Sequence, residues 1–205
     1  MNVDVRRYGK MSVFLHAEDK RNINRVDSGS MTAIIRIGQD FQNNFYEIRI
    51  PLTTTRQKLY ASSEARDVWP LENELNLSLM DLVKLKLERD KQNIPFNKKF
   101  GQNFGRQRYS VMGNPNLGEV RGVLIAFENT KSDVPMDAEV WINELRLSDL
   151  DEEGSWAALG RMDISLADLG TIAVSVNSRT TGFGSIEQKM NERAKTGLTQ
   201  FDIAT

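Results

Sequence analysis

The feature that most constrains the fold is a pair of strictly alternating segments near the end of the sequence. In residues 156–166, apolar or small residues occupy every second position, with Arg161 and Asp163 between them. Residues 172–177 alternate in the same way after a turn at 167–170. A period of two predicts strands with one apolar and one polar face. Because an isolated hairpin is marginally stable in water, this apolar face needs a surface to cover it.

Composition excludes several classes of protein and of site. The 205 residues are 40% hydrophobic and 27% charged, as in folded proteins. The chain contains no cysteine, so disulfides, thiolate nucleophiles and Cys-ligated metal sites are excluded. A net charge of -1 provides no general attraction to nucleic acid or to an anionic membrane surface. No run of about 18 apolar residues predicts a membrane-spanning helix, and residues 1–15 lack the apolar stretch of a signal peptide.

Strand patterns dominate the first 150 residues. A short helix is predicted through about residue 89, and Ser78 and Asp81 have the spacing of a capping box at its start. Without βαβ alternation, the turn chemistry favours an antiparallel β-sandwich over residues 1–150. Residues 151–205 are expected to form a linker and partial strands, and we expect the chain to be a piece of a longer protein. Strands are predicted at 10–18, 31–40, 44–52, 72–79, 120–129 and 138–150.

The segment 91–110 interleaves basic side chains with aromatic rings. This composition is typical of proteins that bind single-stranded nucleic acid. It is also typical of a long loop that inserts its rings into a groove, and the frequent glycine and asparagine residues favour this second interpretation. We therefore expect a functional loop that contacts a partner other than nucleic acid. The candidate interface residues are Lys98, Lys99, Phe100, Phe104, Arg106, Arg108 and Tyr109.

Three further features carry weaker signals. Trp69 lies in a predicted loop and is a candidate for stacking on a glycan, whereas Trp141 is expected in the core. His16, the only histidine, lies within a predicted strand, so we expect a structural role.

An acidic turn offers oxygen ligands to Ca²⁺ but lacks the spacing of a calcium-binding loop, so a solvated turn is favoured and no cofactor is expected. The residues of this turn are Asp149, Asp151, Glu152 and Glu153.

Three long phrases of the sequence are distinctive. They are RYSVMGNPNLGEVRGVLIAFEN (108–129), AEVWINELRLSDLDEEGSWAALGRMDISLADLGTIAVSVN (138–177) and TTGFGSIEQKMNERA (180–194). Together they resemble the SprA/Sov family of giant outer-membrane translocon proteins of Bacteroidota, which serve type IX secretion and, in some members, gliding motility. The likeness runs through most of the chain from about Tyr8.

The resemblance implies a giant β-barrel whose membrane strands are interspersed with inserted soluble domains. Residues 1–150 are then an inserted sandwich, which looks like a jelly roll similar to carbohydrate-binding modules. The apolar face of the following strands is expected to contact lipid and the polar face the barrel lumen, so membrane contact is confined to residues 156–176. The membrane-strand face comprises Trp156, Met162, Ile164, Leu166, Ile172, Val174 and Val176.

The resemblance also implies a function without catalysis. We expect a structural and interaction domain in the outer membrane or cell envelope of a Gram-negative bacterium, with the sandwich in the periplasm or at the cell surface. The expected partners are other segments of the same barrel protein and accessory or cargo proteins of the secretion system. A glycan-binding β-sandwich module is the alternative. No nucleophile, base or metal site in the sequence supports an enzyme.

Overall fold

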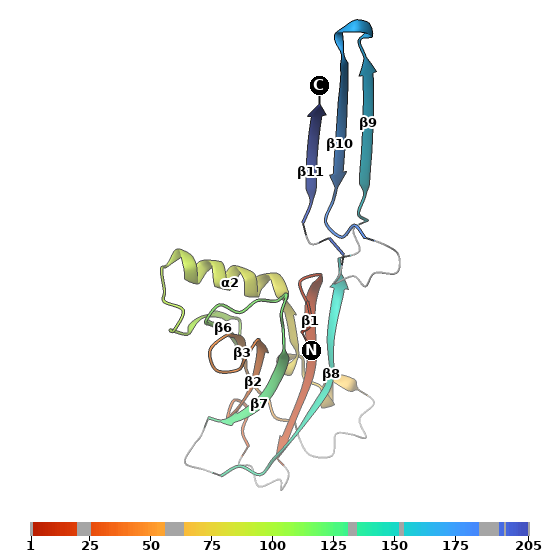
Figure 1. Cartoon of the computed structure of the whole chain (residues 1–205). Coiled ribbons are helices and arrows are strands. Elements are labelled where there is room, and N and C mark those ends of the chain that lie inside the picture. Colours follow the sequence, from red (N-terminus) through yellow and green to blue (C-terminus); the bar gives the residue numbers. More distant parts are fainter. Residues whose placement is uncertain are drawn as a thin grey trace. The chain divides into compact units, whose positions relative to one another are not determined.

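Antiparallel pairing of strands dominates the structure, as the alternating patterns predict (Figure 1). The computed structural model describes residues 2–19, 26–55, 64–130, 135–151, 154–184, 193–194 and 196–204. It is mainly β with few helices, which confirms the predicted fold class. The chain divides into two compact units, residues 1–151 and 152–205.

The first unit is a β-sandwich of two antiparallel sheets. One sheet has the strand order β4-β1-β8, and the other has the order β5-β6-β3-β2-β7. The strands are β1 Tyr8–Asp19, β2 Met31–Gly38, β3 Phe45–Pro51, β4 Leu75–Ser78, β5 Phe100–Phe104, β6 Gln107–Met112, β7 Gly122–Asn129 and β8 Ala138–Leu150. All six strands predicted for this part of the sequence are present, whereas the finer description as a jelly roll stays a prediction.

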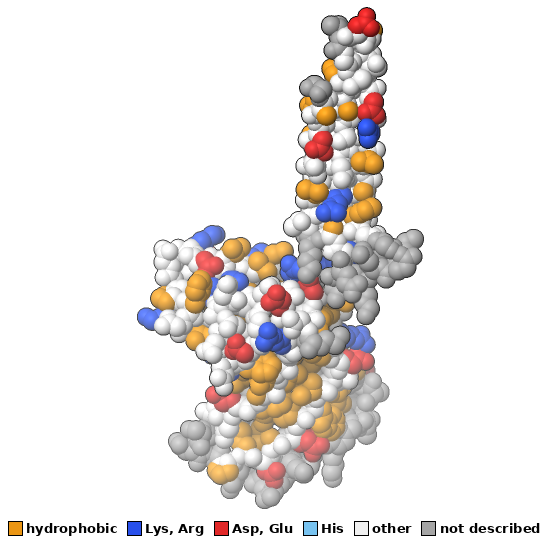
Figure 2. Space-filling model, viewed as in Figure 1, with side chains coloured by type: hydrophobic (Ala, Val, Ile, Leu, Met, Phe, Trp, Pro, Cys, Tyr) orange, Lys and Arg blue, Asp and Glu red, His pale blue; other side chains and the backbone are white. Residues whose placement is uncertain are grey.

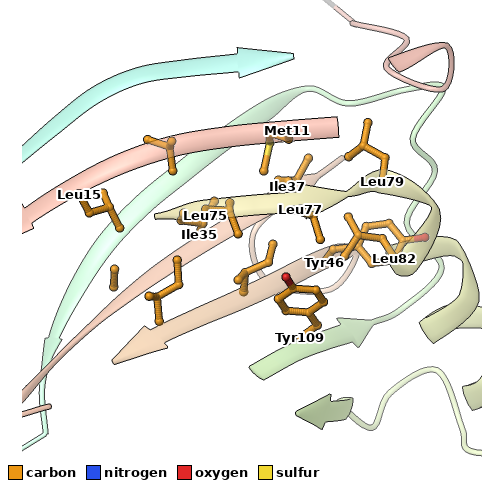
Figure 3. Packing of buried hydrophobic residues seen from close by; sticks show 14 of the residues in the cluster. Met11, Leu15, Ile35, Ile37, Tyr46, Leu75, Leu77, Leu79, Leu82 and Tyr109 are labelled. Atoms are coloured by element: carbon orange, nitrogen blue, oxygen red, sulfur yellow. The ribbon is translucent and has the colours of Figure 1, made fainter. Parts of the chain in front are cut away.

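The core lies between the two sheets and is built from alternate residues of their strands. Met11 and Leu15 on β1 are at most 2% exposed, and so are Ile35 and Ile37 on β2. Figure 3 shows this packing, in which side chains from β3, β4, β6 and the helix α2 join those of β1 and β2. Burial of one such side chain contributes about 1.5–3 kcal/mol. The period of two therefore brings these strands together as one sandwich.

Helix α2 (Leu79–Lys91) closes one side of the sandwich. It packs against β1 and β4 of one sheet and against β5 and β6 of the other. Leu79, Leu82 and Leu85 are buried, which is the spacing of an amphipathic helix. Ser78 occupies the N-cap position as predicted, but its side chain makes no capping hydrogen bond, so the predicted capping box does not form. Two shorter helices, α1 (Ala65–Val68) and the 3₁₀ helix η2 (Leu71–Asn73), precede β4.

Arg89 lies on the same face of α2 and is completely buried. Its guanidinium donates hydrogen bonds to the carbonyl of Gly113 and to the carboxylate of Asp90. The guanidinium carbon also lies 4.6 Å from the centroid of the Phe96 ring. A buried charge is tolerated where it is paired and hydrogen-bonded. Through its hydrogen bond to Gly113, Arg89 therefore links the turn after β6 to helix α2.

The turn at Gly113 approaches the connection between β2 and β3 so closely that a side chain does not fit. Gly113 has a φ of 68°, and a Cβ there would overlap with the carbonyl oxygen of Asn43. The connection itself is ordered by Asp40, whose carboxylate accepts backbone N–H groups of Asn43, Asn44 and Gln42. These bonds hold the pKa of Asp40 well below its usual range.

The second unit is a three-stranded antiparallel sheet with the order β11-β10-β9. Its strands are β9 Ala157–Ser165, β10 Thr171–Arg179 and β11 Leu198–Ala204. The predicted hairpin is present, with a 3₁₀ turn η3 (Ala167–Leu169) at its tip, and the last predicted strand joins it.

Among the described helices of the whole chain, none has the length and hydrophobicity needed to cross a membrane.

We predict that Arg89→Ala destabilises the first unit by roughly 2–4 kcal/mol. The substitution removes the hydrogen bond to Gly113, leaves that carbonyl unpaired and opens a cavity beneath Phe96. Urea denaturation of the variant measures the loss. Lys91→Ala is the matched control, because Lys91 is exposed in the same turn, and its effect should stay within about 0.5 kcal/mol. Equal effects of the two substitutions would contradict the role assigned to Arg89.

Candidate functional site

The segment predicted as a functional loop is largely a β-hairpin. β5 and β6 pair antiparallel, with Phe100 opposite Val111, and Gly105 has a φ of 60° in the connecting turn. The prediction of a loop is therefore wrong for residues 100–110. The prediction rested on the frequent glycine and asparagine residues, and in β5 these residues and Gln102 leave apolar side chains only at the two ends of the strand. The edge position of β5 explains this polarity, because an edge strand buries little of its own surface.

The hairpin places the predicted aromatic rings on the side of the core. Phe100 packs against the core cluster, and Tyr109 belongs to it with 6% exposure. Phe104 stacks on Tyr109 with ring centroids 4.5 Å apart, and the Tyr109 hydroxyl donates to Gln107. Burial raises the pKa of Tyr109. Two of the three rings are thus part of the fold, and only Phe104, at 37% exposure, presents substantial surface to a partner.

The predicted cations lie apart from these rings. Lys99 reaches the sheet face that points away from the core and donates to Glu47 at 2.6 Å. Arg108 donates to the amide oxygen of Asn103 at 3.1 Å. Arg106, in the turn of the hairpin, is exposed and donates to Thr53 at 3.2 Å, and Lys98 is also exposed. The structure therefore brings Lys99 and Arg108 onto one face, whereas Lys98 and Arg106 are exposed outside it.

Glu47 is the centre of this outer face. It lies in β3 with 0% of its side chain exposed. Its carboxylate accepts hydrogen bonds from Lys99 at 2.6 Å and from Arg36 at 2.7 Å, and Arg49 lies 3.9 Å away. Arg49 in turn forms an ion pair with Glu128 on β7. The Glu47 cluster comprises Arg36, Glu47, Arg49, Lys99, Arg108 and Glu128.

The Glu47 cluster carries a net positive charge. Burial alone would raise the pKa of Glu47, but the hydrogen bonds and charges of Lys99 and Arg36 outweigh burial and lower it. Glu47 therefore stays ionised and holds its cations in place. The side chains of Arg36 and Arg49 are each 29% exposed and that of Lys99 is 41% exposed. Such a face can bind carboxylate or phosphate groups of a partner.

Sequence reasoning missed Arg36 and Glu47, although a signal for both is present. Each is a charged residue at an alternate position of a predicted apolar strand. Alternation places both on the outward face of their strands, and the observed register pairs Arg36 with Glu47 across a connection of residues 39–44. A turn at residues 39–43 would instead place Arg36 opposite Tyr46, so the sequence indicates the shared face but not the pair. Opposite charges on facing positions stabilise the observed strand pair. The contribution of Lys99 was not predictable either, because Lys99 comes from a distant part of the sequence.

His16 has the buried position expected of a structural histidine. Its side chain is 1% exposed and its ring stacks on Trp141 with centroids 4.4 Å apart. The Nδ1 atom lies 2.7 Å from the carbonyl oxygen of Val68, and Nε2 lies 3.4 Å from the carboxylate of Glu18. The ring thus connects β1 to the segment that carries Trp69.

The tryptophans do not form a flat surface for a sugar ring. Trp69 and Trp141 are both half-buried, and their rings are tilted by 57° at a centroid distance of 6.4 Å. Trp141 was expected in the core but is only partly covered, because β8 ends its sheet. Trp156 belongs to the second unit. The glycan-binding alternative stays a prediction, which polysaccharide binding by the chain and by a Trp69→Ala variant would test.

The acidic turn engages neighbouring basic residues. Asp149 forms an ion pair with Lys10 at 2.8 Å, and the backbone N–H of Asp151 donates to the carbonyl of Arg7. Glu152 and Glu153, the other two weak candidates for Ca²⁺, lie outside the described residues. Within the described ranges, no group of three or more His, Asp or Glu side chains is placed to hold a metal ion.

In the second unit, the predicted apolar face is continuous across three strands. Ile164 lies opposite Ile172, and Met162 lies opposite Val174, which in turn lies opposite Ile203. Directly paired residues point to the same face of a sheet. The face contains the predicted residues Met162, Ile164, Ile172, Val174 and Val176, and β11 adds Phe201 and Ile203. The two added residues are 69% and 72% exposed.

The remaining predicted residues of this face flank β9. Trp156 and Thr180 are joined by backbone and hydroxyl hydrogen bonds, and the N–H of Leu166 donates to the carbonyl of Gly170. Both pairings continue the β9–β10 register, so Trp156 and Leu166 belong to the same side. They are 55% and 43% exposed.

The opposite face of this sheet is mostly polar. Arg161 and Asp163 form an ion pair at 3.0 Å, and Ser175 lies opposite Arg161. Gln200 and Asp202 continue this face on β11. Leu159, 78% exposed, is an exception on the polar side. The three strands therefore form a sheet that is apolar on one face and polar on the other, with the apolar face exposed.

Comparison with protein families gives a match over the whole sequence. The family SprA_N, described as motility related/secretion protein, matches residues 1–205 and so includes both units. No match is found among curated proteins.

We predict that Glu47→Gln lowers the free energy of unfolding by roughly 1–3 kcal/mol at pH 7. The change leaves Arg36 and Lys99 without their counter-charge, while the side chain keeps its shape. Because the folded state lowers the pKa of Glu47, its contribution is complete above the unfolded pKa of about 4.3 and is lost as the pH falls through the folded value. The difference between wild type and variant should therefore shrink between pH 5 and the acid limit of the fold.

The control for this measurement is Glu128→Gln. Glu128 pairs with Arg49 on the same face, but its side chain is 45% exposed, so the expected loss is about 0–1 kcal/mol. Urea denaturation at several pH values measures both variants. A Glu47→Gln effect no larger than that of Glu128→Gln, or one independent of pH, would refute the assignment.

Proposed function

Because the chain belongs to the SprA_N family of motility related/secretion proteins, we propose that it is a non-catalytic structural and interaction domain of an outer-membrane protein-export translocon. The family itself supports a role in secretion or motility. The proposal adds type IX secretion and gliding motility, a location in the outer membrane or cell envelope of a Gram-negative bacterium, and the absence of catalysis.

The observation that carries the proposal is the exposed apolar face of β9, β10 and β11. Contiguous apolar surface on a folded protein marks a site of contact with a protein or a membrane. β9 and β10 each have nine residues, which is close to the length of about 9–11 residues of a tilted strand that spans a bilayer. An apolar outer face and a polar inner face are the pattern of membrane strands in an outer-membrane barrel.

The two edges of this sheet support a place within a larger barrel. β9 and β11 each pair with β10 only, among the strands that the structure describes. Free edges of apolar strands require neighbours, and closure into a barrel supplies them. In this proposal the neighbours are other segments of the same large barrel protein.

The first unit supplies an interaction surface on the same protein. Glu47 holds Lys99 on the outer face of the five-stranded sheet, where Arg108 lies opposite Arg49, and Lys98 and Arg106 are exposed close by in the sequence. We propose that this face contacts acidic groups of accessory or cargo proteins, in the periplasm or at the cell surface. Nucleic acid is not a proposed partner.

Single-cysteine labelling tests the proposal, in a full-length protein from which any cysteine outside these 205 residues has been removed, because the 205 residues contribute none. Val174→Cys lies on the apolar face and Ser175→Cys, its neighbour, on the polar face. In the full-length protein in its membrane, we predict that a water-soluble maleimide labels Ser175→Cys at least tenfold faster than Val174→Cys. The second pair, Asp163→Cys and Met162→Cys, should show the same contrast, because these residues lie opposite Ala173 and Val174.

Denatured protein provides the control, since all four cysteines must then react at similar rates. Equal labelling of the two faces in the membrane would contradict lipid contact. Faster labelling of Val174→Cys than of Ser175→Cys would reverse the assignment of the faces.

A further inference from the structure

Among the strands that the structure describes, the two sheets of the first unit end in four edge strands, and three of these edges are protected against further pairing. β4 has four residues and β5 has five, so each offers a short edge. β8 is longer, but a register shift interrupts its pairing with β1, and Glu144 has a φ of 51°. β8 also carries Glu139 and Arg146. Short edges, bulges and charges are the usual means by which proteins block edge-to-edge association.

Val120, just before the fourth edge strand β7, already pairs with Val3 of the N-terminal segment. Among the described residues, β7 itself lacks all of these protections. Its eight residues pair with β2 in continuous register from Gly122 opposite Gly38 to Asn129 opposite Met31. The strand contains no proline, and its single charged residue is Glu128. The carboxylate of Glu128 is already paired with Arg49. A long, regular and nearly uncharged edge is a template for another strand.

The sequence of β7 is that of an inner strand and not of an edge. GVLIAFE is a nearly continuous apolar run, which is typical of a strand covered on both faces. Its inward residues, however, are poorly covered. Val123 and Phe127 are each 37% exposed, whereas Ile37 and Ala33, their partners on β2, are 2% and 0% exposed.

The side of the sandwich at β7 is also the side that α2 leaves open. The helix packs on β4, β5 and β6 at the other side of the two sheets and on the central strand β1, whereas β7 and β8 end the sheets opposite to it among the described strands. On β8, Ile142 and Leu145 are 47% and 44% exposed. In the view of Figure 2, hydrophobic side chains gather on the face where Figure 1 draws β7 and β8.

We propose that the free edge of β7 binds an extended segment of another polypeptide as a sixth strand of the five-stranded sheet. An extended backbone can replace water as the hydrogen-bonding partner of the N–H and C=O groups along such an edge. Because β7 has eight residues, the segment that pairs with it is expected to be about six to eight residues long. Because β7 is apolar on both faces and Glu128 already has its counter-ion, the segment is uncharged and has apolar side chains on both faces.

A single strand fits this edge better than a second copy of the chain. A second copy that continued both sheets would bring its own β8 edge to the β8 edge of the first. Both edges carry Glu139 and Glu144, and the bulge at Glu144 interrupts the register. A single segment brings no such edge, and its inward side chains can cover Val123, Phe127 and Ile142. This proposal uses only the first unit and holds whether or not the second unit contacts lipid.

Site-specific photo-crosslinking in the full-length protein, in cells, tests the proposal. Benzoylphenylalanine replaces Val123 in one variant and Phe127 in a second, and mass spectrometry maps the residue captured by each. The expected result is that both probes capture one segment of apolar, uncharged sequence, at two positions about four residues apart. This spacing is the signature of strand pairing, because the two probes lie four residues apart on β7.

Two further variants serve as controls. Benzoylphenylalanine at Asn103 on the protected edge β5 should give no such spaced pair of adducts. Leu124→Lys places a charge on the outward face of β7 and should lower the adduct yield from position 127 at least fivefold. Thermal unfolding of the purified Leu124→Lys chain, with a midpoint within a few degrees of the wild type, shows that the sandwich is intact.

The proposal is overturned if neither probe forms an adduct, or if the captured residues do not follow one extended segment. Adducts between β7 strands of two copies, with position 123 joined to position 127, would assign the edge to self-association instead. An undiminished yield in the folded Leu124→Lys variant would show that the contact does not use the edge.

Discussion

The packing of β1 against β2 and β3 supports every other feature of the first unit. Met11 and Leu15 on one sheet and Ile35 and Ile37 on the other are removed from water together, and this requires two layers of strands in fixed register. The polar residues that alternate with these core residues then lie on the face of each sheet that points away from the core. The Glu47 cluster exists because Arg36 and Glu47 occupy those positions on neighbouring strands. The second unit has the same alternation, but its described residues form a single layer, in which the apolar face is exposed.

The charged groups of the first unit divide into those that hold the fold and those that face a partner. Arg89 is fully buried and fastens α2 to the Gly113 turn. Glu47 is buried as well, but its cations are partly exposed, so one carboxylate both stabilises the sheet and orders a positive surface. A surface with fixed cations loses little side-chain entropy when a carboxylate or phosphate binds. The fixed cations of the Glu47 cluster therefore support the proposal that the five-stranded sheet binds acidic groups of a partner.

Strands were predictable wherever alternation or a continuous apolar run was clear. The apolar face of β9 and β10 was predicted from the alternation around Ile164 and Ile172, whereas the exact register of this hairpin and of the Arg36–Glu47 pair came from the structure. The hairpin of β5 and β6 was not predicted, because Gly101, Gln102 and Asn103 interrupt the alternation of apolar and polar residues that indicates a strand. The open edge at β7 was not predictable, since its apolar run indicates an inner strand. The sequence pattern indicates which faces of a strand are apolar and need to be covered. Only the structure shows which elements cover them.

Hydrogen exchange of the 205-residue chain tests the central claim, which is that the first unit is stabilised by its own core and the second needs an apolar surface. Amides of β2 and β3 should exchange slowly in water and in detergent micelles alike. Amides of β9, β10 and β11 should exchange rapidly in water and at least tenfold more slowly in micelles, because the micelle covers the face that contains Val174 and Phe201. Protection of β9–β11 in water equal to that of β2, or no slowing in micelles, would contradict the account.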